Sequence, residues 1–166
     1  MYRGFSLVEL LVYLAIFATA LVLIVGTALG LSRAYGGFAN ISRIERDATA
    51  ILERMTREAR GSGSVDTGAS ILGLNPSKLI LNTTDEEGTA RTVEFFVSGA
   101  ALKMKENGVD AGALTGSRVS APSFVARRIA TGRSEAVKIE FALQSGTGQA
   151  STTKKFYTTV VLRNSY

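Results

Sequence analysis

Glu9 carries the most chemically informative side chain in the N-terminal part of this chain. Between residues 1 and 32 the only charged side chains are those of Arg3 and Glu9. A charge at the centre of a bilayer costs about 2.5–3.5 kcal/mol. A positively charged partner would offset that cost. The position of Glu9 beside an apolar segment therefore calls for a chemical reason.

The segment that follows Glu9 has the length and composition of a membrane span. Residues Leu10 to Leu31 form a run of 22 residues without a charge. As a helix this run would extend roughly 33 Å, about one hydrocarbon thickness. Arg3 before the run favours a cytoplasmic amino end, whereas Arg33, Arg43 and Arg46 on the other flank oppose that orientation.

The arrangement of Gly4, Phe5 and Glu9 before this apolar run resembles the type IV pilin and type II secretion pseudopilin superfamily. That family has a short basic leader ending in Gly, then Phe, and Glu as the fifth residue after the cut. The resemblance implies that a prepilin peptidase cleaves between Gly4 and Phe5 and methylates the new amino group of Phe5. It also implies that Glu9 pairs with the terminal amine of a neighbouring pilin or pseudopilin subunit, and that an inner-membrane platform protein serves assembly.

Two other interpretations of the apolar run remain open. A secretory signal could be cut after Ala20 or Gly30, but the first cut leaves Leu-Val-Leu-Ile-Val exposed and the second exceeds the usual apolar length of about 7–15 residues. An uncleaved membrane anchor accounts for the length of the apolar run but not for the presence of Gly4-Phe5 or Glu9. The carboxylate of Glu9 could also reach the lipid headgroups without any protein partner.

Composition argues against an enzyme. The 166 residues contain no histidine and no cysteine, which removes the most common general base and excludes cysteine-rich zinc sites and disulfides. Nothing in the sequence places a nucleophile beside a base. We therefore expect no catalytic residues, no metal site and no cofactor. The net charge of +5, or +4 without Arg3, is a mild surplus that does not by itself indicate nucleic-acid binding.

A second helical pattern follows the apolar run. Apolar residues recur at helical spacing on one face, and Gly61-Ser62-Gly63 is expected to end the helix as a C-cap and flexible exit. The stripe consists of Ile41, Ile44, Ala48, Ile51, Leu52, Met55 and Ala59. Four glycines, at 26, 30, 36 and 37, lead us to expect bending or local melting of the helix there.

Short strands are expected after residue 63. Alternating or β-branched segments predict strands at 78–82, 91–97, 101–105, 124–129, 135–144 and 155–163. Ser98-Gly99-Ala100 is expected to be a hairpin turn. An amphipathic helix followed by strands with one apolar face predicts an α+β fold, with a long N-terminal helix (a membrane half and an amphipathic half) packed against an antiparallel sheet.

This pattern divides the chain into a leader (1–4), a transmembrane helix (5–32), an amphipathic helix (33–61) and a β-rich globular domain (62–166) packed on residues 41–59. The stretches 57–60 and 155–164 resemble minor pilins and J-type pseudopilins, and the lack of cysteine departs from major pilins with a disulfide-bounded loop. We interpret the chain as a structural filament subunit, single-pass in the inner membrane among its lipids, with the amino end cytoplasmic and the globular domain outside the cytoplasm. The alternative is a DNA-binding minor pilin used in DNA uptake, although nucleic acid is not the first choice of partner.

Overall fold

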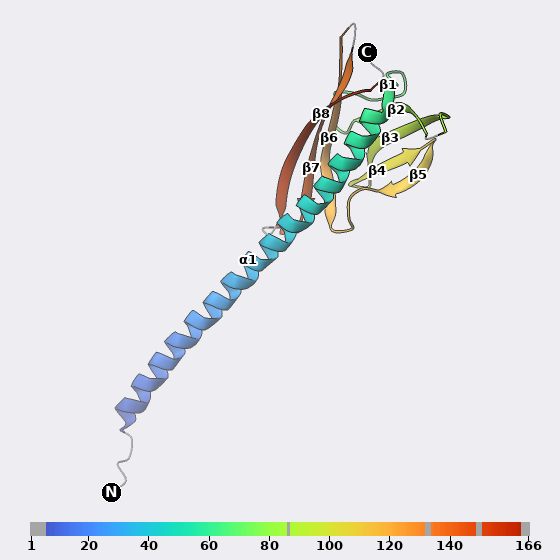
Figure 1. Ribbon diagram of the computed structural model, residues 1–166. Helices are drawn as coiled ribbons and strands as arrows, with labels where there is room; N and C mark the ends of the chain where they lie inside the picture. The colour runs from blue at the N-terminus through green and yellow to red at the C-terminus, as the bar shows by residue number, and fades with distance from the viewer. Residues whose placement is uncertain (1–5, 86, 132–133, 149–150, 164–166) are drawn as a thin grey trace. The chain divides into compact units, whose positions relative to one another are not determined.

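The structure is a computed structural model that describes residues 6–85, 87–131, 134–148 and 151–163. Within these residues one long helix is followed by short antiparallel strands (Figure 1). The elements are α1 (Leu7–Gly61), β1 (Ser62–Val65), β2 (Lys78–Thr84), β3 (Ala90–Ser98), β4 (Ala101–Glu106), β5 (Val109–Ala113), β6 (Val119–Ala130), β7 (Glu135–Ser145) and β8 (Thr152–Val161). The chain divides into two compact units, Met1–Phe38 and Ala39–Tyr166.

The C-terminal part of α1 supplies one wall of the core of the second unit. The side chains of the predicted stripe are buried at Ile44, Ala48, Ile51, Met55 and Ala59. They join one apolar cluster with residues from β2, β3, β4, β6, β7 and β8. Figure 1 shows this part of the helix lying across the strands. The predicted α+β fold, with the helix packed on antiparallel strands, is therefore confirmed.

The strands form two sheets rather than one. The first has the order β1-β2-β3-β4-β5 and the second the order β6-β7-β8, and neighbours are antiparallel in both. The segment between β1 and β2 runs beside β6, because Gly73 N–H donates to the Ala126 carbonyl and Ser77 N–H donates to the Phe124 carbonyl, each at 2.8 Å. The two sheets thereby share one core.

Two short strands were not predicted from the sequence. Ser62–Val65 pairs with β2 as β1, although Gly61-Ser62-Gly63 was expected to be a C-cap and flexible exit. Its first residue, Ser62, is buried and donates its hydroxyl to the Glu58 carbonyl at 2.6 Å. β5 pairs with β4 but consists of Val-Asp-Ala-Gly-Ala, which has little strand propensity. Tertiary pairing, rather than local preference, forms both strands.

The glycines of α1 do not interrupt it. The glycines at 26, 30, 36 and 37 all lie within the continuous helix, so of the two expected outcomes local melting is wrong, whereas bending stays a prediction. A Cβ atom added at any of them would meet nothing within 4 Å. The hairpin at residues 98–101 does form as predicted. Its two central residues, Gly99 and Ala100, have φ angles of 59° and 63°, as the tightest hairpin turns require.

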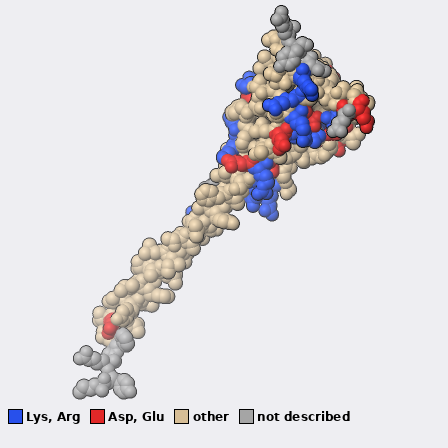
Figure 2. All heavy atoms as spheres, viewed as in Figure 1, with Lys and Arg blue, Asp and Glu red and all other residues tan. Residues whose placement is uncertain are grey.

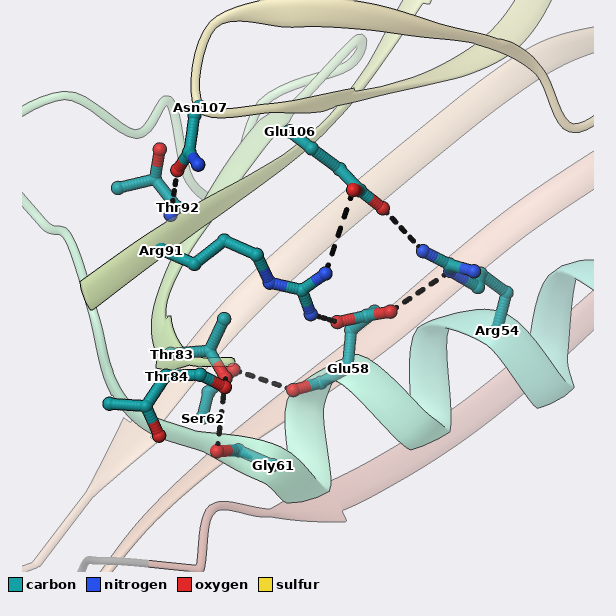
Figure 3. A network of polar contacts seen from close by, with 10 residues as sticks. All are labelled: Arg54, Glu58, Gly61, Ser62, Thr83, Thr84, Arg91, Thr92, Glu106 and Asn107. Atoms are coloured by element: carbon teal, nitrogen blue, oxygen red, sulfur yellow. Dashed lines mark hydrogen bonds and ion pairs between the residues drawn. The ribbon is translucent and has the colours of Figure 1, made fainter. Parts of the chain in front are cut away.

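A network of ion pairs fastens the end of α1 to the first sheet (Figure 3). Glu58, with an exposed fraction of 6%, lies 3.0 Å from Arg54 Nε and 2.6 Å from Arg91 Nη2 on β3. Glu106 on β4 completes the network, 2.5 Å from Arg54 and 3.6 Å from Arg91. The two guanidinium groups and two carboxylates alternate, so each charge has an opposite neighbour. The network fixes where the helix ends relative to β3 and β4.

Candidate processing and assembly site

The predicted site lies at the start of α1, and the structure describes only part of it. Gly4 and Phe5, the predicted cleavage and methylation residues, lie outside the described residues. α1 begins at Leu7, directly after Ser6. The Ser6 hydroxyl accepts a hydrogen bond from the Glu9 N–H at 3.2 Å, and the Ser6 carbonyl accepts one from Leu10 N–H at 3.2 Å. Ser6 therefore caps the helix.

Glu9 lies in the first turn of this helix with its side chain exposed. The Tyr13 hydroxyl donates to Glu9 Oε1 at 3.4 Å, one turn further along. The partial positive charge of the helix amino end stabilises a carboxylate at this position. The carboxylate is thus held near the helix start and remains open to a further donor on its exposed side.

Sequence reasoning missed two residues of this arrangement. Tyr13 was not assigned to the site, yet its hydroxyl contacts Glu9. Ser6 was not considered. The signals were present in the spacing: Ser6 and Glu9 stand three apart, as in a capping box, and Glu9 and Tyr13 stand four apart on one helix face.

The surface of α1 beyond Glu9 is apolar and exposed. Large side chains such as Leu14, Phe17 and Leu31 have exposed fractions of 61%, 64% and 73%. In the view of Figure 2 this stretch is almost free of charge, whereas basic and acidic side chains cover the second unit. By length and composition α1 qualifies as a membrane span. An apolar surface of this extent needs lipid or other protein to cover it.

Polar side chains within the apolar stretch are satisfied by the helix itself. The Thr19 hydroxyl donates to the Ala15 carbonyl and the Thr27 hydroxyl donates to the Ile24 carbonyl, each at 2.8 Å. Hydrocarbon offers no hydrogen-bond partner, so such internal bonds make these residues compatible with a bilayer. Glu9 differs, because its charge is balanced by no ion pair among the described residues.

The described residues offer no competing metal centre. Across residues 6–85, 87–131, 134–148 and 151–163, no three His, Cys, Asp or Glu side chains gather where they could hold an ion. What this part of the chain offers chemically is a capped helix start with one carboxylate and an apolar surface. That arrangement suits helix association rather than bond-making chemistry.

Comparison with known proteins bears on the same segment. A family model described as "Prokaryotic N-terminal methylation motif" matches residues 1–25. No curated protein and no solved structure matches the chain. The matched motif implies processing by prepilin peptidase and assembly with other pilin subunits, and points to a structural subunit rather than an enzyme. With the long apolar helix it also supports anchoring in a membrane. The motif at residues 1–25, with the long helix that begins within it, supports a relationship of this segment to the type IV pilin and pseudopilin superfamily.

Proposed function

We propose that this chain is a minor subunit, a minor pilin or pseudopilin, of a type IV pilus-like or type II secretion filament. The observation that carries the proposal is the pairing of two features on α1. A long exposed apolar surface can be buried among other helices, and Glu9 presents one carboxylate at its start. A subunit that leaves lipid for a filament core uses both features.

In this proposal Glu9 binds the terminal amine of a neighbouring subunit. Cleavage between Gly4 and Phe5 creates that amine, and methylation of Phe5 leaves it cationic. In an apolar filament core both partners of this ion pair are needed, because removing either one leaves the other as an uncompensated buried charge. The contact of Tyr13 with Glu9 Oε1 supports the proposal, since it orients the carboxylate. The pair would set the axial register between adjacent subunits.

The division of the chain follows from the same proposal. Residues 1–4 form the leader, 5–32 the membrane helix, 33–61 the amphipathic helix and 62–166 the β-rich domain. The helix crosses the inner membrane once, surrounded by lipid until assembly, with the amino end cytoplasmic and the β-rich domain outside the cytoplasm. Extraction from lipid then depends on an inner-membrane platform protein.

The proposed role as a minor subunit is supported by the interactions that hold the C-terminal strands in place. With no cysteine in the sequence, no disulfide can bound a loop near the C-terminus. β8 is held instead by its pairing with β7 and by the apolar contacts of Val160 and Leu162. The chain thus departs from the many major pilins in which a disulfide bounds a loop near the C-terminus.

The expected stoichiometry tests the minor role. In filaments sheared from cells, this subunit should be present at a small fraction of the most abundant pilin or pseudopilin. Quantitative mass spectrometry with isotope-labelled peptides from β3 and β7 measures that ratio. A ratio near one to the principal component would show a major subunit instead.

A further inference from the structure

A cavity of about 700 Å³ lies in the second unit, apart from the helix start. Its walls come from α1, the turn between β3 and β4, the loop between β5 and β6, and the turn after β7. The charged side chains that line it are Arg43 and Arg118, and no lining residue is acidic. Its size is that of a small-molecule site.

The guanidinium group of Arg43 is held in place at the cavity wall. Arg43 Nη1 donates to the side-chain oxygen of Asn40 at 3.0 Å, and the same oxygen accepts from the Ser145 hydroxyl at 3.3 Å. Asn40 is itself buried. One edge of the planar guanidinium group of Arg43 is thus held by the protein. Its other N–H groups remain available to a ligand.

Neither arginine of this cavity is neutralised by the protein. Among the described residues, Arg43 and Arg118 take part in no ion pair. By contrast, Arg54 and Arg91 of the network in Figure 3 each contact two carboxylates. The cavity therefore has a surplus of positive charge, with Arg43 held in place by Asn40 and Arg118 exposed on the loop between β5 and β6.

Hydroxyl groups add neutral donors to the same walls. Thr115 and Ser117 line the cavity, as does Ser120, whose hydroxyl donates to the Gln144 carbonyl at 3.5 Å. Thr115 has an exposed fraction of 6%, and its Oγ1 is buried with no hydrogen-bond partner among the described residues. Buried hydroxyls without a partner are uncommon in folded proteins, so this donor marks an unsatisfied polar position in the wall of the cavity.

One acidic side chain, Asp47, lies in a smaller lobe that shares Arg43 and Arg118 and adds Arg46. Its Oδ2 accepts a hydrogen bond from Gly116 N–H at 2.7 Å. A Cβ atom at Gly116 would come within 3.1 Å of that oxygen, so glycine lets the loop lie against the helix. Asp47 thus positions the loop that carries Arg118, and the larger lobe stays free of negative charge.

We propose that this cavity binds a phosphate group. The walls combine two arginines with the hydroxyl groups of Ser117 and Thr115, and the planar guanidinium groups of arginines match phosphate oxygens well. A phosphate has more acceptor oxygens than a carboxylate and can satisfy more of these donors at once. The group can belong to free phosphate or to a phospholipid headgroup, since both offer the same oxygens.

The first test titrates inorganic phosphate into the full-length protein in an uncharged detergent at constant ionic strength. Arginine side-chain N–H signals report binding by NMR. We expect saturable shifts for Arg43 and Arg118, and at least a tenfold weaker affinity in Arg118→Gln, because a hydrogen bond to a charged group is lost. Arg57→Gln is the matched control, since Arg57 is exposed on the same helix and does not line the cavity.

A second variant, Thr115→Val, preserves the shape of the side chain and removes its hydroxyl. It should weaken phosphate binding without lowering the thermal stability of the phosphate-free protein. Equal affinity in wild type, Arg118→Gln and Thr115→Val would overturn the proposal, as would the absence of saturable shifts with phosphate and phospholipid alike.

The source of the phosphate is distinguished in nanodiscs. A headgroup ligand predicts that the Arg43 and Arg118 signals shift between discs of an uncharged galactolipid and discs of phosphatidylglycerol, with no further effect of added phosphate. A free ligand predicts shifts only on addition of phosphate. Tighter binding of a short DNA duplex, with the same dependence on Arg118, would contradict a single-phosphate site and indicate a nucleic-acid surface.

Discussion

Replacing Glu9 with alanine should reduce incorporation of the subunit into filaments at least tenfold. Loss of one partner from a buried ion pair costs about 3–5 kcal/mol, because the remaining charge is stranded. Membrane insertion should not suffer, since the substitution removes a charge from the apolar segment. The processed subunit should therefore accumulate in the membrane. Quantifying the subunit in sheared filaments and in membrane fractions measures both effects.

Two further variants separate the charge of Glu9 from its local contacts. Glu9→Gln keeps the size of the side chain and should fail nearly as badly as alanine. Tyr13→Phe removes only the hydroxyl that lies 3.4 Å from Glu9 Oε1, and should reduce incorporation much less. Crosslinking of the wild-type chain identifies its neighbours within the filament. Normal incorporation of Glu9→Ala at an internal position would refute the ion-pair proposal.

The second large effect is expected at Ile51, which is fully buried beneath both sheets. Ile51→Asp places an unpaired charge in the apolar core, a change that costs more than about 4 kcal/mol. That is a large share of the roughly 5–15 kcal/mol by which domains are stable. We therefore expect the second unit to unfold. Circular dichroism and limited proteolysis of the full-length protein in detergent would show the loss of strands.

Ala50→Asp is the matched control for this substitution. Ala50 is the preceding residue on the same helix and is exposed, so the added charge stays in water. Its effect on the free energy of unfolding should remain within about 0.5 kcal/mol. If Ile51→Asp were as resistant to protease as Ala50→Asp, the buried face of α1 would have been assigned wrongly.

The parts of the fold that could be predicted are the helices and strands whose apolar residues recur with the period of the element's buried face. The stripe from Ile44 to Ala59 has the helical period, and all five of its innermost residues are buried. β7 alternates apolar and polar residues, and both of its ends were predicted to within one residue. In such elements the side chains that need burial are also those that set the period.

The sequence could not predict features that depend on distant partners. Glu58 looked like any helix-surface acid, yet it is buried because Arg91 lies 33 positions away and approaches to 2.6 Å. β6 begins at Val119 rather than near Phe124, because a bulge between Ser120 and Ser123 accommodates the exposed Pro122 within the strand. These arrangements exist only once strands from different parts of the chain have met.

The start of α1 and the cavity of the second unit also differ in how far the sequence could predict them. Ser6, Glu9 and Tyr13 lie within eight consecutive residues, so their contacts follow from helical spacing. The cavity that holds Arg43 and Arg118 is assembled from four separate segments, and nothing in either local sequence marks it as a site. Its recognition required the folded chain.

The amino terminus of the mature protein tests the central claim most directly. Intact-mass and N-terminal peptide analysis of the protein from its native membrane should show a chain that begins at Phe5 with a methylated amino group. That result would follow from prepilin peptidase acting on the motif at residues 1–25. A chain that begins at Leu21 or Leu31 would show a secretory signal, and an intact chain that retains residues 1–4 would show an uncleaved anchor. Either result would contradict the account.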